Sequence, residues 1–164
     1  MRHIISILLQ NEAGALTRVT SLFSTRGYNI ESLSVAPTDD PTVSRLTMVS
    51  DCSDAVMDQI NKQLFKLVDV VNIADMTMDK HFERELLLMK VKLEPNADIK
   101  KIISTAGARV LDDADANFTV ELTGTGVEID NFMNLVSTQS EILTVVRSGA
   151  MAIARGTNIL ASDF

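Results

Sequence analysis

The 164-residue chain contains one cysteine, one tyrosine and no tryptophan. A single cysteine, Cys52, excludes a framework of intrachain disulfide bonds. With so few large aromatic side chains, the chain lacks the stacking platforms on which single-stranded nucleic acid binds. Basic residues are also in the minority, since 15 Lys and Arg stand against 22 Asp and Glu, which gives a net charge of -7. Because nucleic-acid backbones are neutralised by clustered Lys and Arg, we expect no nucleic-acid partner.

Long apolar runs are absent as well. None approaches the roughly 20 residues needed to cross a bilayer, and Met1–His3 leads into a strand pattern without the features of a signal peptide. We therefore expect a cytoplasmic protein with no membrane partner. The hydrophobic fraction of 46% is sufficient for a core, in one domain or in two small ones.

The pattern of apolar residues in the first half predicts the order βαββαβ. Continuous or alternating apolar runs indicate strands. Val19, Leu22 and Phe23 recur at helical spacing before Gly27, a residue type common just past a helix end. Ser53 is placed to cap a second helix. The expected elements are strand 2–9, helix 15–26, strands 30–36 and 43–49 joined by the turn 37–41, helix 53–67 and strand 68–74.

The same order of elements is predicted to return after residue 84. Residues 77–84 are polar and mixed in charge, without helical or strand periodicity, and we interpret them as a linker. Gly124–Gly126 is interpreted as a tight turn between a strand and a helix. The expected elements are strands 85–93, 110–111 and 118–122, helices 99–106 and 130–140, and a last strand pattern over 143–154.

Two βαββαβ units predict an α+β protein made of two ferredoxin-like domains. Each domain is expected to be a four-stranded antiparallel sheet with two helices on one face. The first domain is expected at residues 1–76 and the second at residues 85–164. The second face of such a sheet is bare and usually needs a partner.

The segment Asn11–Leu16 lies between the first strand and the first helix and is the leading candidate for a binding site. It reads as a glycine turn followed by an exposed helix N-terminus, where unpaired N–H groups and the helix dipole favour a carboxylate or phosphate. Taken alone, this loop also has a plain structural interpretation, with Asn11 as a capping or turn residue and Gly14 as a turn glycine. Asn29 likewise suits a left-handed conformation shortly after Gly27.

Two other motifs are incomplete. Residues 113–117 imitate the start of a calcium loop, but Phe118 stands where glycine is required and Gly124 where a bidentate Glu belongs. Gly124–Gly126 is not a dinucleotide fingerprint, because Ile129 occupies the position of its third glycine. The sequence contains no nucleophile–base constellation, metal-ligand spacing or phosphate loop. We therefore expect no catalytic residue, no metal and no cofactor on this chain.

Four stretches of the first half carry a family resemblance: Asn11–Leu16 (NEAGAL), Arg18, Arg26–Leu33 (RGYNIESL) and Pro37–Pro41 (PTDDP). Together with the opening strand, they closely resemble the acetolactate synthase (acetohydroxyacid synthase) small regulatory subunit. The resemblance covers essentially the full length and is densest over residues 1–75, which look like an ACT domain.

The resemblance implies a regulatory protein rather than an enzyme. Such subunits activate a separate large catalytic subunit and confer feedback inhibition by valine or a related branched-chain amino acid, isoleucine or leucine. The effector binds where two ACT domains meet, so the resemblance also implies a homodimer. Thiamine diphosphate, Mg²⁺ and FAD are expected on the catalytic partner. The alternative is a free-standing ACT-type amino-acid sensor that regulates another protein.

Residues matching the family motif then supply an expected effector site. The N–H groups of Gly14, Ala15 and Leu16 are expected to hold the effector carboxylate, with Gly14 allowing close approach of the backbone. Oxygen atoms of Asn11 and Asn29 are expected to accept from its ammonium group. Apolar contact with a branched side chain is expected from Ile30.

Overall fold

The computed structural model describes residues 1–93, 98–114 and 116–161, which form two compact units. The first unit comprises Met1–Phe82 and the segment that begins at Ala150, and the second comprises Glu83–Gly149. The first unit contains β1 (Arg2–Gln10), α1 (Ala15–Thr25), β2 (Ile30–Pro37), β3 (Val43–Asp51), α2 (Asp54–Leu64), β4 (Val70–Asp75) and β9 (Met151–Ala154). Strand β5 (His81–Lys92) begins there and continues into the second unit, followed by α3 (Ile99–Thr105), β6 (Arg109–Ala114), β7 (Asn117–Gly124), α4 (Gly126–Ser137) and β8 (Ile142–Arg147).

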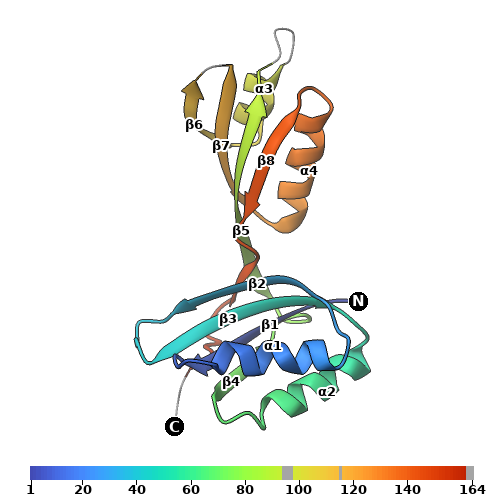
Figure 1. The fold of residues 1–164 in the computed structure, drawn as a ribbon, viewed down its shortest axis with the longest axis vertical. Helices are drawn as coiled ribbons and strands as arrows, with labels where there is room; N and C mark the ends of the chain where they lie inside the picture. Colours follow the sequence, from blue (N-terminus) through green and yellow to red (C-terminus); the bar gives the residue numbers. More distant parts are fainter. Residues whose placement is uncertain (94–97, 115, 162–164) are drawn as a thin grey trace. The chain divides into compact units, whose positions relative to one another are not determined.

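The first unit is an antiparallel sheet with strand order β2-β3-β1-β4. Helices α1 and α2 lie together on one side of this sheet (Figure 1). Alternate residues of the central strand β1, such as Ile5 and Ile7, are buried against the helices with Phe23 of α1 and Ile60 of α2. Because side chains alternate along a strand, the intervening residues face the other way.

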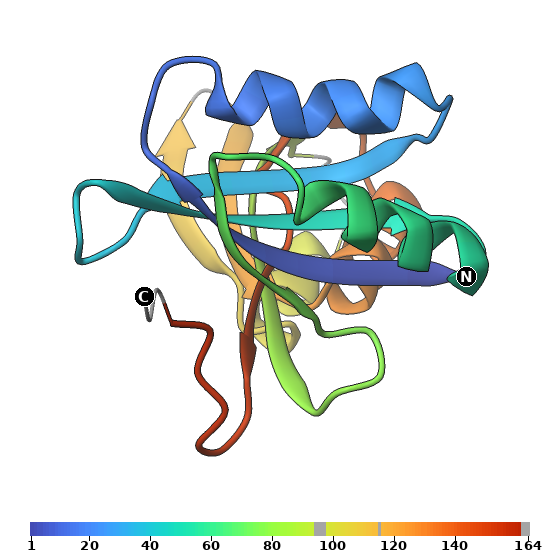
Figure 2. The same ribbon diagram turned by 90° about the horizontal axis from the view of Figure 1, so that it is seen from below.

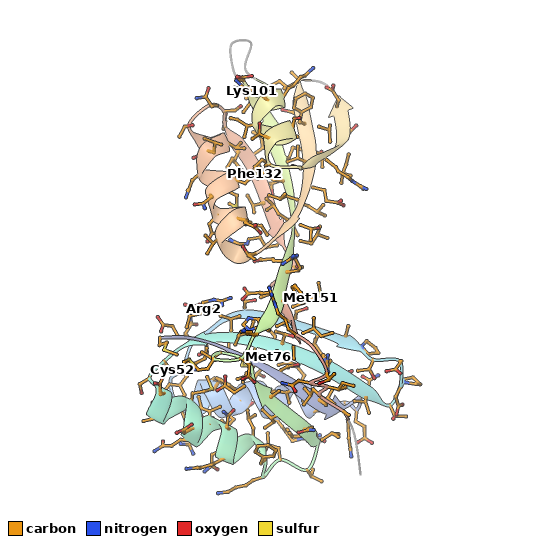
Figure 3. All side chains as sticks on the ribbon, turned by 180° about the vertical axis from the view of Figure 1, so that it is seen from behind. Arg2, Cys52, Met76, Lys101, Phe132 and Met151 are labelled. Atoms are coloured by element: carbon orange, nitrogen blue, oxygen red, sulfur yellow. The ribbon has the colours of Figure 1, made fainter. Side chains whose placement is uncertain are left out.

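The second face of this sheet is covered by the C-terminal segment of the same chain. Ile4 of β1 and Val49 of β3 are buried there with Ala150 and Ala152, which flank and occupy the start of β9. Figure 2 shows the red C-terminal segment leaving β9 within this unit, and Figure 3 labels Met76 and Met151 in the region. Thus the chain covers, over part of its area, a face that was expected to need a partner.

The second unit has the same plan, with strand order β6-β7-β5-β8. Its core lies between the sheet and the two helices, where Leu87 and Phe118 pack with Phe132 of α4, labelled in Figure 3. The α+β, ferredoxin-like fold predicted from the sequence is confirmed. The sheet differs from expectation in one respect, because β9 pairs with β5 and adds a fifth strand.

Three local features differ from the predicted elements. The last pattern, residues 143–154, is divided into β8 and β9 at Gly149, whose φ of 80° breaks the strand. Helix α4 begins at Gly126 instead of residue 130, because Thr125 and Glu128 form a capping box. The predicted linker 77–84 contains the start of β5. The compact units also depart from the expected boundary at the C-terminal end, since β9 packs in the first unit.

The dependence of the first unit on β9 can be tested with two substitutions in neighbouring residues. Ala152 is 7% exposed and faces Ile4 and Val49, whereas Ile153 is 57% exposed. We expect Ala152→Asp to lower the free energy of unfolding by more than about 2 kcal/mol, because it buries a charge without a partner. Ile153→Asp is the matched control and should change it by less than about 0.5 kcal/mol. Urea unfolding measures both, and equal effects would contradict the assigned packing.

Candidate functional site

The loop between β1 and α1 presents unpaired backbone donors. Gly14 has a φ of 88°, in the left-handed region, and places the chain at the start of α1. The first helical hydrogen bond is donated by Arg18 N–H to the Gly14 carbonyl, at 3.0 Å. The N–H group of Ala15 already donates a hydrogen bond to the Glu12 carbonyl, at 3.2 Å. The N–H groups of Leu16 and Thr17 have no acceptor among the described residues, as expected in the first turn of a helix.

Asn11 is fixed at the end of β1 by two hydrogen bonds to the β2–β3 hairpin. Its backbone N–H donates a hydrogen bond to the Thr42 carbonyl at 2.7 Å, and its side-chain Nδ2 donates one to the Pro41 carbonyl at 3.0 Å. This orientation leaves Oδ1 without a partner in the described part of the chain. Asn11 therefore offers an oriented acceptor beside the donors of the helix start.

Asn11, Ala15 and Leu16 border a hollow of about 240 Å³, which we call the loop hollow. Strand register explains its position, because Ser44 of β3 lies opposite both Leu9 of β1 and Pro37 of β2. The end of β2 thereby forms one wall and the loop after β1 the other. The lining residues are Leu9, Gln10, Asn11, Glu12, Ala15, Leu16, Val35, Ala36, Pro37 and Ser44.

An ion pair supports the loop from behind. Arg18 donates from Nη2 to Oδ1 of Asp69 at 2.7 Å and from Nε to the other carboxylate oxygen, and Asp69 is only 2% exposed. The Asp69 carbonyl also accepts from Gln10 N–H, at 2.8 Å. The pair therefore joins the first turns of α1, the end of β1 and the segment before β4. Such a bidentate pair is geometrically specific as well as favourable.

The guanidinium of Arg18 also lies close to Gly14. A Cβ atom added at Gly14 would be 2.8 Å from Nη1 of Arg18, which is too short for a carbon–nitrogen contact. Any side chain at position 14 would displace Arg18 or the turn, in addition to the strain of a positive φ. Because Nη1 is a cationic donor close to the helix start, the loop is suited to a carboxylate.

The structure places the other two expected site residues elsewhere in the first unit. The Asn29 carbonyl accepts from Oγ of Ser50 at 2.7 Å, and Ile30 pairs with Ser50 at the far end of β3. Val43, at the opposite end of β3, pairs with Gln10. The seven residue steps from Val43 to Ser50 span about 23 Å. One chain therefore brings Asn11, Ala15 and Leu16 around the loop hollow, with Gly14 in the adjoining turn, but it does not bring Asn29 and Ile30 to them.

Sequence reasoning missed the contribution of β2. Val35, Ala36 and Pro37 line the loop hollow although the segment from Pro37 was interpreted only as a hairpin tip. The signal that points to them is the β2–β3 hairpin. Because the start of β3 pairs with the end of β2 and with the end of β1, the hairpin brings the end of β2 near the end of β1. Asp69 had no local signal, because its partner Arg18 is 51 residues away.

The described residues contain no group of three or more His, Cys, Asp or Glu side chains suited to a metal ion. The segment 113–117 includes the end of β6 and the first residue of β7, and its residue 115 is outside the described residues. None of the helices in the described chain is long and apolar enough to span a membrane.

The fold of the first unit is that of an ACT domain. Residues 5–72 match the family described as AHAS small subunit-like ACT domain, and residues 84–156 match the family described as small subunit of acetolactate synthase. The chain belongs to the acetolactate synthase small-subunit family.

Whole-chain relatives support this assignment. The small subunit of acetolactate synthase isozyme 3 from Escherichia coli is 43% identical over 162 residues, which cover 98% of this chain and 99% of that protein. The small subunit from Haemophilus influenzae is 42% identical over 163 residues, which cover 98% of this chain and all of that protein. The crystal structure of the small subunit from Thermotoga maritima superposes with a TM-score of 0.85 at 30% identity, over 96% of this chain and 99% of that one.

The Arg18–Asp69 pair predicts a dependence of stability on pH. The hydrogen bonds from Arg18 lower the pKa of Asp69 in the folded protein, against the opposing effect of burial. A lowered native pKa stabilises the fold above the unfolded pKa of about 4, and this contribution is lost as the pH falls through the native pKa. We expect Asp69→Asn to lower the unfolding temperature at pH 7, with a difference from wild type that shrinks below about pH 4.

Calorimetric unfolding between pH 7 and pH 3 measures this difference. Asp58→Asn, at an exposed position of α2, is the control for removing an aspartate. A difference for Asp69→Asn that stays constant down to pH 3 would show that the ion pair does not carry the effect.

Proposed function

We propose that this chain is an effector-responsive regulatory subunit of acetolactate synthase. It associates with the large catalytic subunit and activates it, and a branched-chain amino acid, valine or a close relative, reverses the activation by binding at the loop hollow. The observation that carries the proposal is that the unpaired N–H group of Leu16 and the Asn11 acceptor border one small hollow, with the Arg18 guanidinium beside the adjoining Gly14. Thiamine diphosphate, Mg²⁺ and FAD belong to the catalytic partner in this scheme.

The chemistry of an amino acid matches these groups one by one. Its carboxylate is held by the N–H group of Leu16 in the first turn of α1, with Gly14 leaving room for approach and Nη1 of Arg18 beside that glycine. Its ammonium group is held by Oδ1 of Asn11. Its apolar side chain contacts the wall formed by Val35 at the end of β2. The hollow of about 240 Å³ is of a size for a small ligand.

The remaining expected residues are supplied by a second copy of the chain. Strand β2 is at the edge of its sheet, and its Val35 side chain is 43% exposed. When two such edges pair antiparallel across a two-fold axis, the Pro37 end of one β2 lies beside the Ile30 end of the other. This arrangement brings Asn29 and Ile30 of the second copy to the loop hollow. The effector then completes the interface and reports on its geometry.

Regulation requires that the effector bind the two states of the assembly with different affinity. A difference of about 1 to 3 kcal/mol is typical of allosteric coupling. An effector held between two chains meets this requirement, because a change in the pairing of the β2 edges alters its contacts.

Reconstitution with an acetolactate synthase catalytic subunit tests the proposal. We expect the wild-type chain to raise the activity of that subunit and valine to lower it again. Gly14→Asp should still activate but weaken valine inhibition by more than about tenfold, because it displaces Arg18 and adds a negative charge beside the effector carboxylate. Isoleucine and leucine are titrated in parallel to identify the effector.

Gly107→Asp is the matched control for backbone strain. Gly107 has a φ of 69°, and a Cβ atom there would meet nothing within 4 Å. It lies in the second unit, so its substitution should leave valine inhibition unchanged. Normal inhibition of Gly14→Asp would show that the effector binds elsewhere. Failure to bind or activate the catalytic subunit, with amino-acid binding intact, would favour the free-standing sensor.

Mixing two variants tests whether each site is built from two chains. Asn11→Ala and Asn29→Ala should each abolish valine binding as homodimers. In a mixed dimer one of the two sites combines the intact Asn11 of one chain with the intact Asn29 of the other. Random exchange should therefore restore about a quarter of the wild-type sites, measured by calorimetric titration. No restoration, despite demonstrated subunit exchange, would show that both asparagines act within one chain.

A further inference from the structure

A larger hollow lies on the second face of the first unit's sheet, away from α1 and α2. It has a volume of about 660 Å³, within the range of small-molecule sites, and we call it the second-face hollow. Its floor follows the strand register, because Arg45 of β3 lies between Leu8 of β1 and Ala36 of β2. The segment Ile159–Ala161 and β9 provide the opposite wall.

Arg45 is the only basic residue in the described lining of this hollow. Its Nη2 donates to the Leu160 carbonyl at 2.9 Å. Its Nε is buried and has no hydrogen-bond partner among the described residues. The edge of a guanidinium formed by Nε and one Nη normally binds the two oxygens of a carboxylate. In Arg45 only half of this edge is used, and a buried donor is left unsatisfied, which is unfavourable.

The rest of the lining restricts the ligand. Leu8, Val43, Met151 and Leu160 are apolar, so they favour a ligand with an apolar body. The lining also includes two acidic residues, Asp39 and Asp40, at the tip of the β2–β3 hairpin. The Asp40 carboxylate already accepts from the backbone and hydroxyl of its neighbour two residues on, which lowers its pKa and keeps it charged. This negative charge disfavours phosphates and other polyanions.

We propose that the second-face hollow binds a small organic monocarboxylate with an apolar body. The carboxylate pairs with Nε and Nη2 of Arg45 and replaces the Leu160 carbonyl, and the apolar body packs on Leu8 and Met151. The C-terminal segment moves aside by breaking the single hydrogen bond at Leu160, while Asn72 still holds the Ala161 carbonyl at 2.9 Å. This site differs from the loop hollow, although Ala36 and Pro37 border both, and it does not depend on the function proposed for the loop hollow.

The test is a titration of the full chain followed by NMR of its methyl groups. The probe is 4-methylpentanoate, and 4-methylpentanamide is the neutral control with the same body. We expect saturable shifts for methyl groups of Leu8, Met151 and Leu160, with smaller or no shifts for Leu16 and Val35 at the loop hollow. The amide should bind at least about tenfold more weakly. Leucine, the amino derivative of the probe, distinguishes a free acid from an amino acid as the natural source.

Two variants separate recognition by Arg45 from its effect on the C-terminal segment. Arg45→Gln removes both the cation and the hydrogen bond to Leu160, and should weaken the probe at least about tenfold. Asn72→Ala removes the neighbouring hydrogen bond to Ala161 without removing the cation, and should leave the affinity within about twofold. Urea unfolding confirms that both variants are folded.

Three results would overturn the proposal. Absence of saturable shifts at the second-face hollow would show that it is not a site. Equal binding of acid and amide would exclude recognition of the carboxylate. Equal loss in Arg45→Gln and Asn72→Ala would show that the C-terminal segment, and not the guanidinium, determines binding.

Discussion

The burial of β1 on both faces is the constraint on which the first unit depends. Ile5, Ile7 and Leu9 pack beneath the helices, whereas Ile4 and Leu8 are buried on the opposite side. A strand with two apolar faces needs cover from two layers, because either face left in water forfeits its hydrophobic stabilisation. The helices supply one layer and the C-terminal segment contributes to the other. The loop that follows β1 is consequently anchored to a strand that is buried on both faces, which suits it to orient a ligand.

Much of this architecture is readable from the sequence, and its failures have physical causes. The apolar run at residues 4–9, broken only by Ser6, predicts a strand, and the continuous rather than alternating burial found there is typical of a strand covered on both faces. What covers the second face was not predictable, because β9 has only four residues and only three residues, Ser148–Ala150, separate it from β8. Gly149 was the available sign of a break. The start of α4 was also readable, since Thr125 and Glu128 have the spacing of a capping box.

In the candidate site too, the residues set by local sequence features could be predicted, and those set by tertiary packing could not. Gly14 and the helix start could be predicted because a turn glycine and a helix N-terminus are local features. The prediction that Ala15 donates to a ligand meets a competing acceptor, the Glu12 carbonyl, which no sequence pattern revealed. Asp69 and the wall from β2 depend on tertiary packing, and neither periodicity nor spacing reports such contacts. Placement of Asn29 far from Asn11 within one chain follows from antiparallel register, which the predicted hairpin already implied.

The two hollows meet at the end of β2, because Ala36 and Pro37 line both. This edge strand is also the one that we propose to pair with a second copy, so a ligand in either hollow would contact an element of that proposed interface. Shared contact is not sufficient for coupling, since a ligand with equal affinity for two positions of β2 shifts neither. When each ligand does prefer one position, the sign of the coupling is fixed by whether the two preferences agree. Linkage then requires the effect to be equal in both directions, so the ligand of the second-face hollow changes effector affinity by the factor that the effector imposes on it.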